Sequence, residues 1–451
     1  MTGPALAALV FAGVIAAILV RIPVAVAIGG AGIAGTWAIL GSAAGPMSQL
    51  KTLPFDIFST PSLVIVPLFL LMGQVATQTG LSAALFGVAG DWAGHRRGGM
   101  ALAGIGASAG FGAICGSSLA TASTMAQVAL PEMRARGYSD ALAAGTVAAG
   151  GTLGILIPPS VILVIYAIMA EANIVTLFAA ALLPGLLAAA GYALVITLYV
   201  RIAPEAGPAG ARAPLKARLA GLSQAWPVLA IFGLTMGGML LDLDWQSAGL
   251  QALFTPNEAA AFGAMATVLH GALTGRLNLT GLVEAILETA RTTAMIFAIL
   301  LGAELFKGFL ALTQAPQALA GWVEAAGIAP VVVLAAMLLA YLIFGCVMDS
   351  LSMILLTVPV FLPVIEALDF GLQPGEAAIW FGILALMAVE VGLITPPVGL
   401  NLFILSAAAP GIDVRRIWAG VLPFILSDVV RIAILGALPA ISLWLPRWLA
   451  G

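Results

Sequence analysis

The sequence contains few charged residues. Asp, Glu, Lys and Arg make up 8% of its 451 residues, whereas soluble domains carry about 25%. The two cysteines are too few for a disulfide framework or a thiol-rich metal cluster. The net charge of −3, without a large basic cluster, argues against a nucleic-acid partner. Composition thus excludes an ordinary soluble domain, a disulfide-rich secreted domain and a nucleic-acid-binding protein.

Hydrophobic residues are abundant instead. They make up 62% of the chain, and the mean hydropathy is +1.14. Apolar runs close to the ~20 residues that cross a bilayer recur along the whole length, for example around 5–20, 179–200 and 331–348. We therefore predict an all-α polytopic membrane protein embedded in the lipid bilayer.

The positions of the charges predict how two segments enter the membrane. Segment 98–130 has arginines before and after it, so both of its ends are expected in the cytoplasm. Segment 329–368 lies in a stretch without Lys or Arg and is bordered by acidic residues, so its ends are expected on the opposite side. We predict that these segments are re-entrant helical hairpins, accompanied by about ten spans.

A pattern of small residues followed by a Pro-Pro pair occurs twice. Residues 111–121 read FGAICGSSLAT and 151–160 read GTLGILIPPS, while 344–353 read FGCVMDSLSM and 392–401 read GLITPPVGLN. Proline interrupts a helix because it lacks an N–H group and its ring clashes with the preceding turn. Each copy therefore predicts a hairpin followed by a broken helix, the arrangement typical of a secondary transporter's binding site.

The two copies define the expected domain organisation. Residues 1–200 form the first repeat, 201–224 a Pro- and Gly-rich cytoplasmic linker, and 225–451 the second repeat. Because the two hairpins open to opposite sides, the repeats are predicted to be inverted.

A helix broken inside the membrane exposes backbone groups that can bind ions. Carbonyl oxygens and hydroxyls suit a hard cation such as Na⁺, whereas the N–H groups at a helix N-terminus suit a carboxylate. The candidate cation-binding residues are Ser117, Ser118, Gly151, Thr152, Gly154, Asp349, Ser350, Gly392 and Thr395. The candidate substrate-binding residues are Ser118, Thr121, Ser160, Ser352 and Asn401.

Several carboxylates fall within apolar segments, where a charge is costly. Asp349 is interpreted either as a cation ligand or titrating group, or as a cap for backbone N–H groups. Aligning the second copy of the pattern with the first places Asp349 opposite Gly116. Glu390 is expected to help hold the second break. Asp428 and Arg431, three residues apart, are expected to form a structural ion pair.

Three long strings, GFGAICGSSLATASTM, GGTLGILIPPS and VEVGLITPPVGLNLFIL, resemble the large membrane subunit of tripartite ATP-independent periplasmic (TRAP) transporters. The resemblance runs over nearly the whole chain. It implies an elevator-type transporter of the bacterial inner membrane that couples uptake of an organic acid, such as a C4-dicarboxylate or sialic acid, to Na⁺. It also implies two partners, a small four-helix membrane subunit and a periplasmic substrate-binding protein. No cofactor is expected besides Na⁺ as the coupling ion.

Three other interpretations remain open from the sequence. A stand-alone divalent-anion/Na⁺ symporter would typically carry Ser-Asn-Thr at its hairpin tips, where this chain has Ser-Ser-Leu and Asp-Ser-Leu. An intramembrane serine protease is suggested by the G-x-S-x-G string at 106–110, although neither histidine is placed as a base. A passive channel fits two opposed hairpins less well than alternating access does. We predict a transporter and not an enzyme.

Overall fold

The computed structural model describes residues 2–240, 254–409 and 411–449, which form helices and no β-strand. The helices of the first half are α1 (Gly3–Leu19), α2 (Val24–Leu40), α3 (Ala44–Phe58), η1 (Pro61–Val64), α4 (Ile65–Gln78), α5 (Leu81–Ala93), α6 (Gly99–Cys115), α7 (Ser118–Ala135), α8 (Asp140–Leu156), α9 (Val161–Met169), α10 (Ile174–Ile202) and η2 (Pro204–Ala206). Those of the second half are α11 (Leu215–Leu240), α12 (Pro256–Leu273), α13 (Leu279–Thr313), α14 (Ala315–Ala325), α15 (Pro330–Gly345), α16 (Ser350–Ala367), α17 (Glu376–Leu393), α18 (Leu400–Ala408), α19 (Val414–Ala437) and α20 (Ala440–Leu449).

The second half repeats the order of helices found in the first. Two helices joined by a short turn (α6 and α7; α15 and α16) precede a helix interrupted at a Pro-Pro pair (α8 and α9; α17 and α18), and a longer helix follows (α10; α19). The α8–α9 pair is bent by 45° at its break. Both segments predicted as hairpins thus fold as helix–turn–helix units, while the orientation of the repeats in the membrane stays a prediction.

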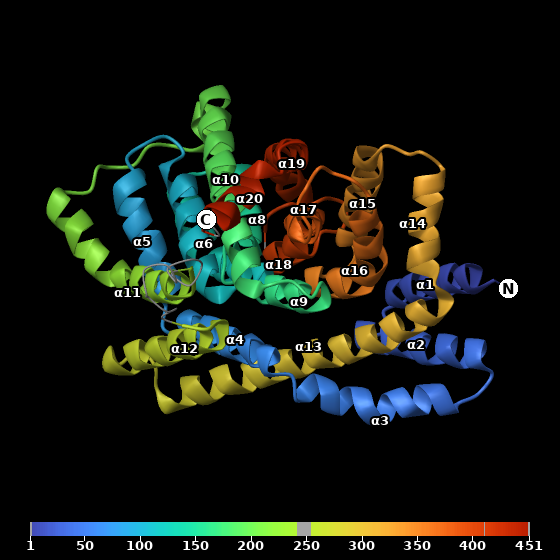
Figure 1. Ribbon diagram of the computed structural model, residues 1–451. Coiled ribbons are helices and arrows are strands. Elements are labelled where there is room, and N and C mark those ends of the chain that lie inside the picture. The colour runs from blue at the N-terminus through green and yellow to red at the C-terminus, as the bar shows by residue number, and fades with distance from the viewer. Residues whose placement is uncertain (1, 241–253, 410, 450–451) are drawn as a thin grey trace.

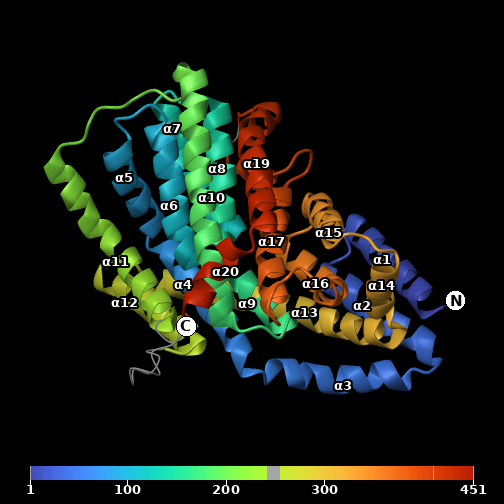
Figure 2. The same ribbon diagram turned by 45° about the horizontal axis from the view of Figure 1, so that its top comes forward.

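A second group of helices forms a frame beneath these units. The 35-residue α13 packs against both α2 and α4, and α4 packs against α12 (Figure 1). Glycines at Gly29, Gly32 and Gly35 line the side of α2 that meets α13: a Cβ on Gly32 would lie 2.6 Å from the carbonyl carbon of Leu305. Small residues let two helix backbones approach this closely. Figure 2 shows α6, α7, α8, α10 and α19 standing together above this frame.

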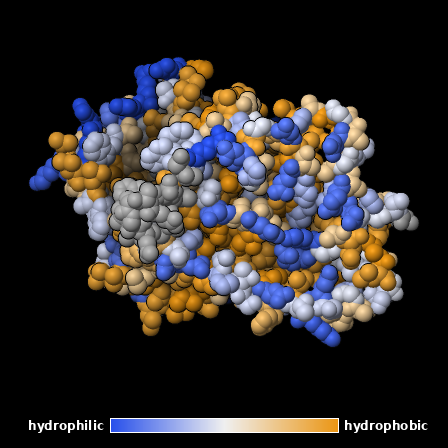
Figure 3. Space-filling model, in the orientation of Figure 1, coloured by the Kyte–Doolittle hydropathy of each residue, from blue (hydrophilic) through white to orange (hydrophobic). Residues whose placement is uncertain are grey.

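The outer surface is that of a membrane protein. Seven helices among the described residues are long and apolar enough to cross a bilayer, and the bent α8–α9 pair could add an eighth. Large apolar side chains such as Leu229 and Met265 are more than half exposed, which a lipid environment explains. Figure 3 shows apolar residues gathered over α12 and the start of α13, and hydrophilic ones near the end of α10 and the start of α11.

The segment between the two halves is shorter than the expected linker. Helix α10 continues to Ile202 and α11 already begins at Leu215, so the chain between these helices covers 203–214. Helix formation continues into the basic flanks because Leu, Arg, Lys and Ala favour helix, whereas the Pro- and Gly-rich centre does not. The division into repeats itself stays a prediction.

Candidate functional site

The turn between α6 and α7 forms the tip of the first hairpin. Helix α6 ends at Cys115, and Gly116 follows with φ +63°, a left-handed conformation that glycine adopts readily. Ser117 then caps α7: its Oγ accepts a hydrogen bond from the N–H of Ala120 at 3.4 Å. A Cβ on Gly116 would lie 2.9 Å from the carbonyl oxygen of Pro159. The first tip therefore rests directly on the break in the first broken helix.

The tip of the second hairpin is capped by a carboxylate. Asp349 accepts a hydrogen bond from the N–H of Ser352 at 3.0 Å, and the Ser352 hydroxyl also donates to it. These contacts pair one of the backbone N–H groups that a helix start leaves open. The N–H of Gly399, at the start of α18, donates to the carbonyl oxygen of Cys346 at 3.1 Å. The second tip thus also rests on the break that follows it.

The structure corrects the register between the two tips. The sequence comparison that sets Asp349 against Gly116 is wrong, because Asp349 is the N-cap of α16 as Ser117 is the N-cap of α7. Ser118 and Ser350 are the first helical residues after these caps. Ser117 lies six residues after Phe111, whereas Asp349 lies five residues after Phe344, so the alignment based on the Phe-Gly pairs is shifted by one residue. The chemical asymmetry of the tips is therefore a hydroxyl against a carboxylate.

Glu390 of α17 lies between the two tips. Its Oε1 accepts hydrogen bonds from the Ser350 hydroxyl at 2.6 Å and from the Ser118 hydroxyl at 3.5 Å. All three side chains are buried. The second carboxylate oxygen, Oε2, has no hydrogen-bond partner within the described ranges. One buried carboxylate thus joins two residues that the sequence assigned to separate cation sites.

The second half of each broken helix packs on the hairpin of the other repeat. Helix α9 packs on α16, and α18 packs on α7; α9 and α16 are seen together in Figures 1 and 2. Ser160 caps α9, since its Oγ accepts a hydrogen bond from the N–H of Leu163 at 3.4 Å. Thr121 on α7 and Asn401 on α18 are buried, and their side-chain polar atoms lack hydrogen-bond partners in the described part of the chain. Unpaired buried groups cost free energy, so these two side chains are suited to bind a polar ligand.

The glycines predicted at the breaks hold the broken helices against the hairpins. A Cβ on Gly154 would lie 2.6 Å from the carbonyl oxygen of Ser117, and one on Gly392 would lie 2.6 Å from the Cα of Gly345. A Cβ on Gly151 would lie 2.6 Å from the Cβ of Ala122 on α7. These positions admit no side chain, and they bring backbone oxygens of the tips next to the breaks.

Thr152 takes part in a different buried network. Its Oγ1 lies 2.9 Å from the Tyr192 hydroxyl, which donates to Asp428 at 2.9 Å. Asp428 and Arg431 form an ion pair of 2.7 Å, as predicted. All four residues are buried. The network connects the first broken helix to α10 and α19, so it positions α8.

Two further predicted hydroxyls are engaged within their own elements. The Thr395 hydroxyl donates to the carbonyl oxygen of Val391 at 2.6 Å, one turn earlier in α17. The Ser352 hydroxyl donates to Asp349. Each oxygen keeps lone pairs, so the roles assigned to Thr395 and Ser352 stay predictions.

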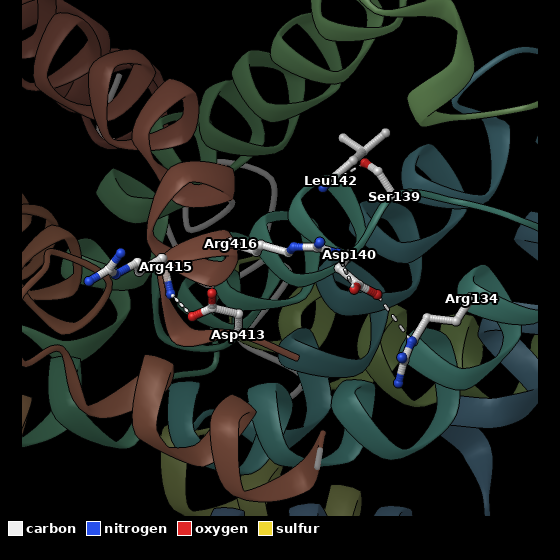
Figure 4. A network of polar contacts seen from close by, with 7 residues as sticks. All are labelled: Arg134, Ser139, Asp140, Leu142, Asp413, Arg415 and Arg416. Atoms are coloured by element: carbon white, nitrogen blue, oxygen red, sulfur yellow. Dashed lines mark hydrogen bonds and ion pairs between the residues drawn. The ribbon is translucent and has the colours of Figure 1, made fainter. Parts of the chain in front are cut away.

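An ion-pair cluster joins the two halves of the chain at the end of α8 that lies opposite the break (Figure 4). Asp140 pairs with Arg134 at 3.1 Å and with Arg416, at the start of α19, at 3.2 Å. Ser139 caps the same helix end by accepting a hydrogen bond from the N–H of Leu142 at 3.3 Å. An acidic residue in the first turn also interacts favourably with the helix dipole.

We expect Asp140→Asn to lower the free energy of unfolding by about 1 kcal/mol or less, since exposed ion pairs contribute little. Thermal unfolding of the purified protein at low and high salt measures the change, which should shrink as salt screens the charges. Glu132→Gln, which removes the exposed pair with Arg136, is the matched control. A loss of several kcal/mol for Asp140→Asn would contradict this expectation.

The serine-protease interpretation is wrong. Ser108 lies in the interior of α6, whereas the G-x-S-x-G nucleophile requires a sharp strand-to-helix turn. Its hydroxyl is buried without a hydrogen-bond partner among the residues described. A Cβ on Gly150 would lie 2.5 Å from that hydroxyl oxygen. Ser108 is a small packing residue between α6 and α8.

Sequence reasoning missed the central place of Glu390 and the part played by Tyr192. Glu390 precedes Gly392 by two residues, as Thr152 precedes Gly154. Aligning the two broken helices at their Pro-Pro pairs sets Glu390 against Thr152. That alignment would have shown that the second break has a carboxylate where the first has a hydroxyl. Nothing in the sequence pattern points to Tyr192, which lies in the interior of the long α10.

Two hairpin tips that meet two interrupted helices within an apolar helical protein define the class of membrane secondary transporters. The sequence profile described as "Tripartite ATP-independent periplasmic transporter, DctM component" matches residues 11–441. The chain belongs to this family, as the resemblance predicted, and its relatives are transporter permeases and not enzymes.

Individual relatives agree with the family assignment. The chain is 35% identical over 405 residues to the C4-dicarboxylate TRAP transporter large permease protein DctM of Pseudomonas aeruginosa, covering 89% of this chain and 90% of that protein. It is 31% identical over 391 residues to the sialic acid TRAP transporter large permease protein SiaM of Vibrio cholerae, covering 86% and 87%. The crystal structure of the Alcanivorax borkumensis YdaH transporter shares the fold, with a TM-score of 0.60 and 16% identity over 88% of this chain and 89% of that one.

Proposed function

We propose that this large permease carries an organic acid into the cell and that the Na⁺ gradient drives the uptake. A carboxylate such as a C4-dicarboxylate or sialic acid is the proposed substrate class, supported by the relatives that bear these substrates in their names. Na⁺ is the coupling ion, and no other cofactor is proposed.

The observation that carries the proposal is the meeting of both tips and both breaks at one buried site. The ends of α8 and α17 expose carbonyl oxygens, and the starts of α9 and α18 expose N–H groups. Oxygen ligands suit Na⁺, and helix N-termini suit the carboxylate of a substrate. A site that binds both ligands together couples the movement of one to the other.

The proposed ligands follow from this arrangement. Those for Na⁺ are Ser117, Ser118, Gly151, Thr152 and Gly154 in the first repeat and Asp349, Ser350, Gly392 and Thr395 in the second. Those for the substrate are Ser118, Thr121, Ser160, Ser352 and Asn401. Among the substrate candidates, Thr121 and Asn401 have the strongest support because their polar atoms are buried and unpaired in the described ranges.

The grouping of the helices supports an elevator mechanism with inverted repeats and re-entrant hairpins. The frame of α2, α4, α12 and α13 packs within itself. The hairpins and broken helices are tied to α19, since a Cβ on Gly145 of α8 would lie 2.2 Å from the carbonyl oxygen of Gly420. In the proposed cycle the hairpins and broken helices move as a unit past the frame.

The proposed setting is the bacterial inner membrane. There the chain works with a small four-helix membrane subunit and receives substrate from a periplasmic binding protein. The apolar surface of the described helices supports the membrane location, and the family supports the partners.

Reconstitution into proteoliposomes tests the proposal. Uptake is expected only when the binding protein, the small subunit and this chain are present together with an inward Na⁺ gradient. Uptake by this chain alone would favour the stand-alone symporter, and equilibration without accumulation would favour a channel. Either result would overturn the tripartite Na⁺-driven proposal.

We expect Asp349→Asn and Ser117→Ala to raise the Na⁺ concentration for half-maximal uptake. An interaction with a charged group contributes about 1.5–3 kcal/mol, so the expected increase is about tenfold or more. A Na⁺ titration of uptake measures it. Asp369→Asn, an exposed carboxylate in the loop after α16, is the matched control. Unchanged Na⁺ dependence in both variants would remove these residues from the site.

A further inference from the structure

Glu390 is a buried acidic residue that no basic side chain balances. Four charged side chains are buried among the described residues: Arg218, Glu390, Asp428 and Arg431. Asp428 and Arg431 pair with each other, and Arg218 lies over the ring of Trp92. Glu390 forms no ion pair with any described residue, so ionised Glu390 requires a countercharge from outside these side chains.

The elements packed around α17 supply no free cation for Glu390. Helix α19 contributes Arg431, which is held by Asp428 at 2.7 Å. Helix α20 contributes Arg447, which is held by Glu376 at 2.7 Å. The other elements in contact with α17, which are α8, α9, α10, α15, α16 and α18, place no basic side chain within ion-pair distance of Glu390 in the part of the chain described.

The hydrogen bonds of Glu390 use only one of its oxygens. Ser118 and Ser350 both donate to Oε1, and Oε2 is buried with no partner among the described residues. Thr121, one turn after Ser118 on the same face of α7, offers another buried and unpaired oxygen. Burial of an ionised carboxylate is expensive unless a countercharge accompanies it.

We infer that Glu390 binds a Na⁺ ion through Oε2, at a site between the two hairpin tips. The inference rests on the proposed Na⁺-coupled transport and adds to it a site that both tips build together. The carboxylate supplies the compensating charge. The Ser118 and Ser350 hydroxyls fix Oε1, which leaves Oε2 to face the ion.

Such a site favours the meeting of the two tips only when a cation is bound between them. Without Na⁺, bringing Ser118 and Ser350 onto Glu390 buries an uncompensated charge. With Na⁺, the same contact is favourable. Binding at one tip therefore influences the position of the other, although the tips belong to different repeats.

Na⁺ binding by the purified full-length chain tests the inference, with Na⁺ alone as the probe. Thermal unfolding is followed in NaCl against choline chloride at constant ionic strength. Glu390→Gln keeps an oxygen acceptor for the two serines but removes the charge. Without Na⁺ this variant is expected to unfold at a higher temperature than the wild type. Its half-maximal Na⁺ concentration for stabilisation is expected to rise about tenfold or more.

Matched variants separate a cation site from a structural brace. Glu324→Gln, exposed on α14, should leave both quantities unchanged. If Glu390 only holds the two serines in place, Glu390→Gln unfolds at a lower temperature than the wild type and keeps the wild-type Na⁺ response. That result would overturn the inference. If Glu390→Gln does not fold, Glu390→Asp decides, because it keeps the charge and withdraws the carboxylate oxygens by one methylene: a weakened Na⁺ response supports the site, and an unchanged one refutes it.

The uptake assay keeps this inference apart from the proposed function. A wild-type transporter without Na⁺-driven uptake would refute the proposed function itself. Na⁺-driven uptake in the wild type, with the same Na⁺ dependence in Glu390→Gln, would refute the Glu390 site alone.

Discussion

Gly112→Ala is expected to abolish uptake, whereas Gly106→Ala on the same helix leaves it intact. A Cβ on Gly112 would lie 2.6 Å from the Cα of Gly154, but one on Gly106 would have nothing within 4 Å. The contact at Gly112 is with backbone, so no side-chain rotation relieves it and α6 must move away from α8. Such overpacking costs about 1–3 kcal/mol and occasionally more, and it displaces the hairpin tip from the break.

Uptake into proteoliposomes and thermal unfolding measure this effect. Gly106→Ala should be neutral or slightly stabilising, because alanine favours helix over glycine by about 1 kcal/mol. Gly392→Ala provides a test in the second repeat, since its Cβ would lie 2.6 Å from the Cα of Gly345. Wild-type uptake in Gly112→Ala would show that the tip does not need to rest on the break.

Asp428→Leu is expected to destabilise the protein by about 3–5 kcal/mol, because it leaves the buried Arg431 guanidinium without its carboxylate. The Nε and Nη1 groups of Arg431 already lack hydrogen-bond partners among the described residues, and the nearby Tyr192 ring carries no charge to replace that of Asp428. The change also removes the acceptor of the Tyr192 hydroxyl. Denaturant or thermal unfolding of the purified protein measures the loss.

The double variant Asp428→Leu/Arg431→Met separates charge burial from network function. Replacing a whole buried ion pair by apolar residues is often neutral, so most of the lost stability should return. Uptake should stay below the wild type if Tyr192 must hold Thr152 and the first broken helix. A double variant as unstable as Asp428→Leu alone would contradict the charge argument.

Local features of the fold could be predicted from the sequence because they depend on single residues. Pro158 and Pro396 interrupt their helices wherever they occur in the fold. The Asp428–Arg431 pair follows from spacing within one helix. The hairpins follow from length and from the charges at their ends. Each of these inferences needs only neighbours along the chain.

The centre of the site could not be predicted in the same way. That Ser118 and Ser350 meet at Glu390 depends on how two hairpins and α17 pack, which no local periodicity encodes. The same holds for Tyr192, which reaches both Thr152 and Asp428 from a helix in neither break. The wrong pairing of Asp349 with Gly116 arose because the second helix of each hairpin starts at a different distance from the shared Phe-Gly pair, and an alignment of the two strings does not detect where a helix starts.

The packing of α9 on α16 and of α18 on α7 constrains how the protein is made. During synthesis the first repeat emerges well before α16 exists, so α9 has no partner helix α16 to pack on until about two fifths of the chain has followed. Contacts between segments far apart in sequence form late and leave apolar surface exposed meanwhile. An isolated first repeat should therefore be a poor folding unit, and co-expressed halves should assemble only as interlocked pairs.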